Sequence, residues 1–213
     1  MSEGGSKTLQ KSYSFDNVSF SITTADPKDV GAIQKAMQTL SKEMTADLAK
    51  FTADELAAII KKCGPEALVQ AGGIEALKNM AAENSTKANA YIVITSLATT
   101  VGSTVEPLLV PFIPSFIEGV SHKKKEVQVA AEQAGNALID ILCPWAIRVV
   151  QSMLFAGAME TKWQTKVFAL NLLGKLAEKH PRAFCRTLHE SMPVIAAGVW
   201  DTKADVKKAA VKA

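Results

Sequence analysis

Cysteine is scarce in this sequence of 213 residues, which contains three cysteines in all. Cys63, Cys143 and Cys185 lie far apart, form no Cys-x-x-Cys pair and are odd in number. This pattern argues against a disulfide framework or a zinc site, because both are built from paired, closely spaced cysteines. We therefore expect free, buried thiols in a reducing compartment.

Catalytic and cofactor-binding motifs are absent as well. The sequence has no Gly-x-x-x-x-Gly-Lys-Ser/Thr phosphate loop, no Gly-x-Ser-x-Gly turn and no His-Glu-x-x-His motif. Its three histidines, His122, His180 and His189, are followed by no second histidine or cysteine three or four residues on. We predict no catalytic site, no metal or other cofactor and no small-molecule substrate.

Long hydrophobic runs are also missing. The first ten residues are polar, which argues against a signal peptide. The longest apolar stretch, 107–117, is too short to span a bilayer and contains prolines. We expect a soluble, cytoplasmic protein without membrane contacts.

Aromatic residues make up only 6% of a sequence that is 48% apolar, which favours helices packed closely through small side chains. An internal repeat of about 40 residues supports this interpretation. Its anchors recur 39 or 40 positions apart in two independent sets, which are Val127, Val167 and Val206, and Pro114, Met153 and Pro193. A period near 40 with two helices per unit predicts an all-α fold, a HEAT or armadillo-type solenoid of antiparallel helix pairs.

Two regions follow from this period. Residues 1–26 form an N-terminal arm in which alternating apolar and polar residues over 13–22 predict either a short hairpin or disorder. Residues 27–213 form the HEAT-repeat domain. Its last helix has run only about 11 residues when the sequence stops, so we expect a domain truncated at its C-terminal end.

The helices are predicted from capping residues, breakers and apolar periodicity. Asp26 caps a first helix that we expect to reach about residue 50, and Thr52 opens a second helix that ends near residue 63. The remaining expected helices span 65–84 with an interruption at Gly72-Gly73, 85–101, 105–120 with kinks at two prolines, 124–142, 144–160, 162–179, 182–200 and 203–213.

Positive charge is concentrated in the second half of the chain. Residues 1–120 hold 10 basic and 13 acidic residues, net −3, whereas residues 121–213 hold 14 and 8, net +6. Lysines recur at the turns within successive repeats, which stack along one edge of a solenoid. The candidate contacts to a phosphate backbone are Lys123, Lys124, Lys125, Lys162, Lys166, Lys203, Lys207 and Lys208. Alternatively, these lysines only keep the turns soluble.

The three tryptophans allow two interpretations. Trp163 and Trp200 flank the lysine-rich turns, where they would either stack on nucleic-acid bases or pack between repeats, and we favour packing. Trp145 is expected in the core.

Segments near the C-terminal end resemble a known family. Glu160-Thr161-Lys162-Trp163-Gln164-Thr165-Lys166, followed by Met192-Pro193-Val194-Ile195 and by Val199-Trp200-Asp201-Thr202-Lys203, is similar to the N-terminal HEAT domain of translation elongation factor 3. The resemblance is clearest over 160–213. It implies a protein that docks on the ribosome through ribosomal RNA and ribosomal proteins and promotes release of deacylated tRNA from the E site.

The same resemblance implies ATP hydrolysis by two ABC cassettes that this chain does not contain, so the chain itself is expected not to be an enzyme and to act as a monomer. The competing interpretation is a HEAT-type scaffold for other proteins, as in nuclear-transport or phosphatase assemblies. Such a scaffold would bind peptides or helices in its concave groove with little dependence on salt.

Overall fold

The computed structural model describes residues 10–15, 18–23 and 26–213 of the chain. Strands β1 (Gln10–Phe15) and β2 (Val18–Thr23) pair antiparallel in the segment for which the alternating pattern leaves a hairpin and disorder as alternatives. Residues 16 and 17, between the two strands, lie outside the described residues.

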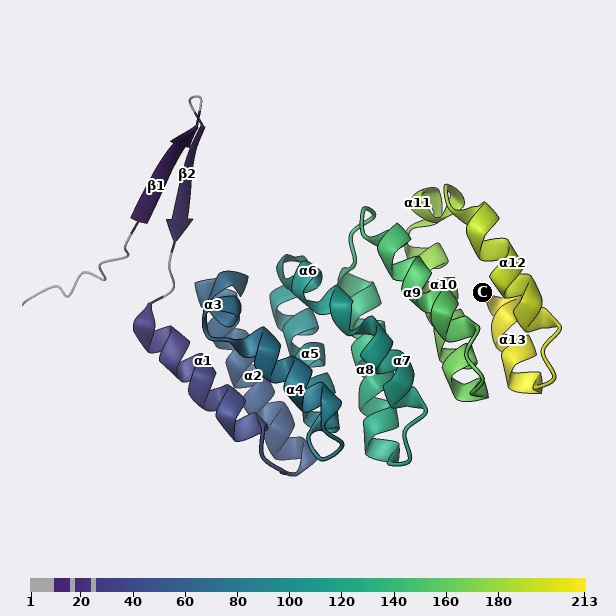
Figure 1. The fold of residues 1–213 in the computed structure, drawn as a ribbon, viewed down its shortest axis with the longest axis horizontal. Helices are drawn as coiled ribbons and strands as arrows, with labels where there is room; N and C mark the ends of the chain where they lie inside the picture. The colour runs from purple at the N-terminus through teal and green to yellow at the C-terminus, as the bar shows by residue number, and fades with distance from the viewer. Residues whose placement is uncertain (1–9, 16–17, 24–25) are drawn as a thin grey trace, which may run out of the picture.

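The rest of the described chain is a succession of helices that form five repeats (Figure 1). The elements are α1 (Pro27–Leu40), α2 (Ala46–Cys63), α3 (Pro65–Gln70), α4 (Gly73–Ala82), α5 (Lys87–Val101), η1 (Gly102–Val105), α6 (Glu106–Leu109), η2 (Val110–Phe112), α7 (Ile113–Val120), α8 (Lys125–Ile141), α9 (Ile147–Ala158), α10 (Trp163–Lys179), α11 (Pro181–Cys185), α12 (Leu188–Val199) and α13 (Ala204–Lys212). The predicted all-α solenoid is confirmed.

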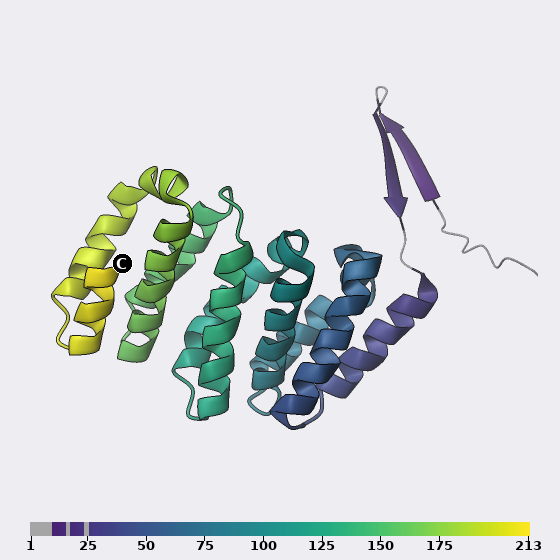
Figure 2. The ribbon, with the colours of Figure 1, turned by 180° about the vertical axis from the view of Figure 1, so that it is seen from behind.

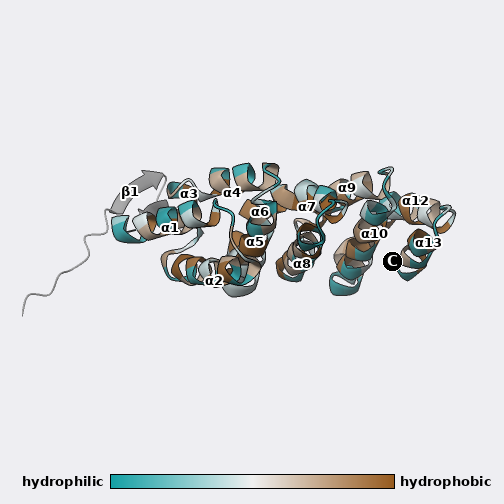
Figure 3. Ribbon diagram, turned by 90° about the horizontal axis from the view of Figure 1, so that it is seen from below, coloured by the Kyte–Doolittle hydropathy of each residue, from teal (hydrophilic) through white to brown (hydrophobic). Residues whose placement is uncertain are grey.

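The repeats stack side by side in two layers. Helices α1, α4, α7, α9 and α12 form one layer, and α2, α5, α8, α10 and α13 form the other, which faces the viewer in Figure 2 and is the lower row in Figure 3. Because the two helices of a repeat run antiparallel, the turns inside the repeats lie along the lower edge in Figure 1 and the connections between repeats lie along the upper edge.

Local signals set most helix ends. The Asp26 carboxylate accepts a hydrogen bond from the Lys28 backbone N–H at 3.0 Å, as expected of a helix N-cap. Gly64 follows α2 with a φ of 89°, and Gly72 precedes α4 with a φ of 71°. Residues other than glycine rarely adopt such positive φ values. The predicted interruption at Gly72-Gly73 is thereby confirmed.

The first repeat differs from its prediction. The chain leaves the helix after Leu40 and resumes it at Ala46, so the expected continuous helix to residue 50 is wrong. Thr52 lies inside α2, where its hydroxyl donates to the carbonyl of Leu48 at 2.9 Å instead of capping a helix start. A threonine satisfies its hydroxyl equally well in either setting, so sequence spacing alone could not decide between them.

The proline-rich segment before α8 also differs from expectation. Instead of one kinked helix over 105–120, the chain forms η1, α6, η2 and α7 in succession. Pro111 and Pro114 each fall in the first positions of a new short helix, where their missing N–H costs no hydrogen bond.

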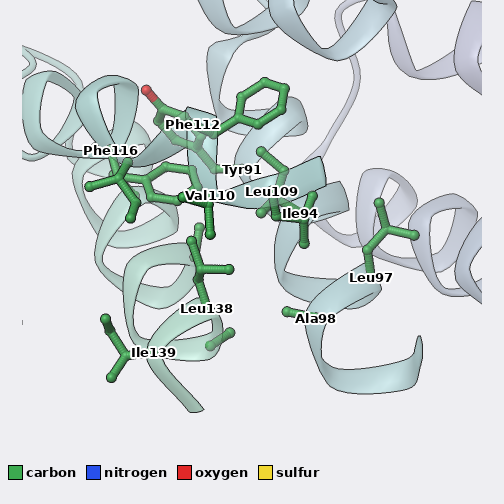
Figure 4. Close-up of a cluster of buried hydrophobic side chains, with 14 of the residues drawn as sticks. Tyr91, Ile94, Leu97, Ala98, Leu109, Val110, Phe112, Phe116, Leu138 and Ile139 are labelled. Atoms are coloured by element: carbon green, nitrogen blue, oxygen red, sulfur yellow. The ribbon is translucent and has the colours of Figure 1, made fainter. Parts of the chain in front are cut away.

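The core runs without interruption between the two layers. At its centre the fully buried Tyr91 packs edge-on against Phe116, with ring centroids 5.4 Å apart, and donates its hydroxyl to the carbonyl of Ser115 at 2.6 Å (Figure 4). Burial raises the pKa of Tyr91 to about 12. Residues 87–120 would suffice by length and composition to cross a membrane, but here they are folded into five short elements of this core.

Candidate nucleic-acid interface

The turns within the third, fourth and fifth repeats share one backbone geometry. Lys124, Lys162 and Lys203 stand directly before α8, α10 and α13, with φ and ψ of −82° and 125°, −80° and 124°, and −89° and 129°. The same extended conformation at equivalent positions directs the three helix starts along the same edge (Figure 1). We call the eight lysines predicted from sequence the lysine edge.

Most of the lysine edge is open to solvent. Seven of its eight residues are exposed, and these are Lys123, Lys124, Lys125, Lys162, Lys203, Lys207 and Lys208. The predicted residues lie before or in the first two turns of α8, α10 and α13, the helices that start along the lower edge in Figure 1. Their contact with RNA remains a prediction.

The helix starts themselves add positive potential to this edge. No side chain at Lys124, Lys162 or Lys203 caps its helix, although the position usually holds Ser, Thr, Asp or Asn. The first N–H groups of α8, α10 and α13 lie at the positive end of each helix dipole without a side-chain cap from the preceding lysine, and Glu126 and Asp205 stand in the first turns of α8 and α13. Lysine and helix terminus thus favour negative charge at the same three places.

Residues two positions earlier shape these turns. The ring Nδ1 of His122 accepts from the Lys124 backbone N–H at 3.1 Å, and a carboxylate oxygen of Asp201 accepts from the Lys203 N–H at 2.9 Å. A His ring and a carboxylate therefore play the same part in two repeats. The lysine backbone is held in place while its side chain remains free to reach outward.

Side chains also link each turn to the next. The Lys162 ammonium donates to the Ser121 hydroxyl at 3.0 Å, and the ring Nε2 of His122 lies 3.3 Å from the amide oxygen of Asn84. These contacts cross repeat boundaries, so the edge is a connected surface and not a set of independent loops.

His122 reports the electrostatics of this surface. Its pKa lies below the ordinary value, first because of burial and then because of the positive charges of Lys87, Lys124, Lys123 and Lys162. Lys87 was not among the predicted residues. It stands 38 positions before Lys125, one short of the repeat spacing, and it is buried with its ammonium 4.0 Å from a carboxylate oxygen of Glu118.

Lys166 is the exception within the lysine edge. Its ammonium lies 2.7 Å from a carboxylate oxygen of Asp201, and the two side chains are 25% and 12% exposed. The hydrogen bond from Lys166, followed by the one from the Lys203 backbone, lowers the pKa of Asp201. Lys166 therefore joins the fourth repeat to the fifth, and only part of its charge faces solvent.

The tryptophans are more exposed than predicted. Trp200 is 85% exposed and Trp163 is 40% exposed, so the expectation that they pack between repeats is wrong for Trp200 and only partly right for Trp163. Trp145 is 87% exposed and lies in the connection between α8 and α9, which contradicts its expected place in the core. Inside the fifth repeat, small residues let the helices approach closely, as where Gly198 of α12 packs against Ala210 of α13.

The His, Cys, Asp and Glu side chains of the described residues are the groups that could supply a metal site. Within that part of the chain, no three His, Cys, Asp or Glu side chains lie close enough to hold a metal ion. The three cysteines are free thiols, but Cys63 and Cys143 are only half-buried and Cys185 is exposed, so the expectation that they are buried is wrong.

Comparison with known proteins finds a family match within the helical repeats. The family model described as EF3 N-terminal HEAT repeat matches residues 49–213. Elongation factor 3 of Gonapodya prolifera is 31% identical over 196 residues, covering 89% of this chain and 18% of that protein. Elongation factor 3 of Zygosaccharomyces rouxii is 34% identical over 125 residues, covering 57% and 12%. The chain thus spans less than a fifth of the length of these relatives.

Solved structures are similar in fold alone. A structure described for TOG–tubulin binding specificity superimposes with a TM-score of 0.57 at 13% identity, covering 90% of this chain and 77% of the other. A crescerin structure, described with a TOG domain array, gives 0.55 at 18% identity over 87% and 73%. These likenesses confirm the helical-repeat architecture.

Proposed function

Since this chain belongs to the family of the elongation factor 3 N-terminal HEAT repeat, we propose that it docks on the ribosome through its lysine edge. In that role it supports translation elongation and the release of deacylated tRNA from the E site. The partners are ribosomal RNA at the lysine edge and ribosomal proteins beside it, and the chain works as a monomer in the cytoplasm.

One observation carries the proposal: three consecutive repeats present an uncapped helix start and a lysine in the same conformation along one edge. An ammonium group attracts a phosphate as a point charge, and the N–H groups of a helix start donate hydrogen bonds to the same anion. Neutralised phosphates release counterions, which drives binding without reading base sequence.

The chain acts by positioning and not by chemistry. The helical domain contains no identified catalytic domain. ATP hydrolysis, if it accompanies docking, belongs to segments of the relatives that lie beyond the part matched by this chain. A stacked set of repeats suits docking, because each link between turns holds the lysines of neighbouring repeats at a fixed separation.

Binding to purified yeast ribosomes across a salt series tests this proposal. Lys123, Lys124 and Lys125 are all changed to Glu, a reversal that the start of α8 tolerates because its dipole favours carboxylates. We expect affinity to fall at least about tenfold, and the slope of log K against log salt to become shallower by about 2 to 3.

A second triple variant controls for net charge. Lys28, Lys35 and Lys61 are exposed lysines of the first repeat, and their change to Glu alters the total charge by the same amount. We expect this variant to bind with nearly the original salt slope. Equal weakening by both variants, or binding that ignores salt, would contradict docking through the lysine edge and favour a protein scaffold instead.

A further inference from the structure

The arginines of this chain all fall in one stretch of the sequence. Of its 24 basic residues only three are arginine, namely Arg148, Arg182 and Arg186, and all three fall within the fourth and fifth repeats. None of them belongs to the lysine edge. Arginine and lysine are not interchangeable, because the planar guanidinium forms paired hydrogen bonds with carboxylates and stacks on aromatic rings.

The arginines flank the connections between repeats, at the edge opposite the lysine edge. Arg148 lies in the first turn of α9, Arg182 lies in α11, and Arg186 directly follows α11 (Figure 1). His180, at the start of α11, donates a ring N–H to the carbonyl of Leu142 at 2.9 Å. This hydrogen bond fixes the connection before α9 beside the one that carries α11.

Exposed apolar side chains accompany the arginines. Trp145 is 87% exposed and Val149, one helical turn further along, is 52% exposed. The Arg148 side chain between them is 78% exposed although one of its nitrogens lies 3.4 Å from a carboxylate oxygen of Glu190. We call Trp145, Arg148, Val149, Arg182 and Arg186 the arginine corner.

The charges around the arginine corner are mostly positive. His189 is exposed beside Glu190, which already faces Arg148. Asp140, at the end of α8, is paired with Lys175 at 2.7 Å, and the exposed Glu178 is the other acidic residue on the adjoining part of α10. Arg148 is paired with Glu190, whereas the described residues form no ion pair with the exposed Arg182 and Arg186, so these two guanidinium groups can attract a negatively charged partner.

We propose that the arginine corner binds an acidic, amphipathic peptide segment of a protein partner. Tryptophan and arginine are the side chains that most often dominate the energy of protein interfaces, where lysine is depleted. The aliphatic Val149 next to Trp145 offers apolar area that a phosphate backbone does not use, whereas a peptide with alternating acidic and apolar faces matches both features. This inference does not depend on docking through the lysine edge.

Selection from a random peptide display library on the whole chain tests the proposal. We expect enrichment of peptides that combine Asp or Glu with aliphatic or aromatic residues. Their affinity for the Trp145→Ala and Arg148→Lys variants should fall at least about tenfold. Because both side chains are largely exposed, neither change should disturb folding, which circular dichroism and thermal unfolding check.

Trp200 provides the matched control. It is 85% exposed, close to the 87% of Trp145, but lies at the opposite edge of the fold. Trp200→Ala should leave the selected peptides bound as before. No enrichment, peptides without acidic residues, or equal loss in the Trp200 variant would overturn the proposal. Binding of a random RNA pool that is lost in the Trp145→Ala and Arg148→Lys variants would also overturn the proposal.

Discussion

The two edges of the solenoid carry the same sign of charge in different chemical forms. The lysine edge repeats one geometry in three successive turns, with a lysine before each helix start. The arginine corner is confined to one place and combines three guanidinium groups with an exposed tryptophan. A repeated row of point charges suits an extended polyanion, whereas a compact mixture of Arg, Trp and Val suits a protein segment.

The largest effect is expected on peptide affinity, when the arginine corner keeps its charge but loses its guanidinium groups. Changing Arg148, Arg182 and Arg186 together to Lys retains every positive charge but removes the guanidinium groups. Selected acidic peptides should bind at least about tenfold more weakly, because paired hydrogen bonds to carboxylates are lost. Ribosome binding measured in parallel should keep its affinity and salt slope. A loss of ribosome binding of similar size would mean that the two edges serve one partner.

A smaller effect divides the lysine edge itself. Lys166→Met removes the contact with Asp201, so thermal unfolding should shift down by roughly 2 °C while affinity for RNA changes less than about twofold. Lys207 is exposed and lies one repeat further on, so Lys207→Met should weaken RNA binding and leave the unfolding temperature nearly unchanged. Scanning calorimetry and RNA titration distinguish them, and identical behaviour of the two variants would refute the structural role of Lys166.

The pH dependence of the Lys166 contact follows from the lowered pKa of Asp201. A carboxylate whose pKa is lower in the folded state stabilises the fold above its unfolded pKa, about 3.9. That contribution is lost as the pH falls through the folded pKa. The difference in unfolding temperature between the original chain and Lys166→Met should therefore shrink below about pH 4, and a difference that persists at lower pH would contradict this pairing.

The smallest expected effect is a change in the pKa of His122, read from its ring resonances by NMR. Burial and neighbouring lysines lower this pKa, so Glu at 123 and 124 should raise it. A bound polyanion should raise it in the original chain for the same reason. An unchanged value on addition of RNA at low salt would place the RNA elsewhere.

The repeat spacing was enough to predict most of the architecture. It located the starts of α8, α10 and α13 within one or two residues, because Val127 and Val206 are buried anchors of equivalent helices. The break after Leu40 was missed, since the sequence there contains neither proline nor glycine. The side-chain amide of Asn89 donates to the carbonyl of Leu40, the last residue of α1, at 3.1 Å. Because Asn89 is 49 positions further along the chain, the sequence around Leu40 gives no indication of this hydrogen bond.

The candidate sites were predictable to different degrees. Spacing placed the lysines on one edge, but whether Lys166 faces solvent or Asp201 depends on a residue 35 positions further on in the next repeat. Trp145 is expected in the core, but it lies in the connection between α8 and α9 and not on a helix face that lines the core, so it is 87% exposed. The restriction of all three arginines to 148–186 is a feature of the sequence, whereas their exposure comes from the structure.

The most direct test of two separate edges is a comparison of three salt series on ribosomes. The original chain, the variant with Glu at 123, 124 and 125, and the variant with Lys at 148, 182 and 186 are measured together. The slope of log K against log salt should become shallower by about 2 to 3 in the first variant alone. An unchanged slope in that variant, or an equal change in both, would contradict docking through the lysine edge.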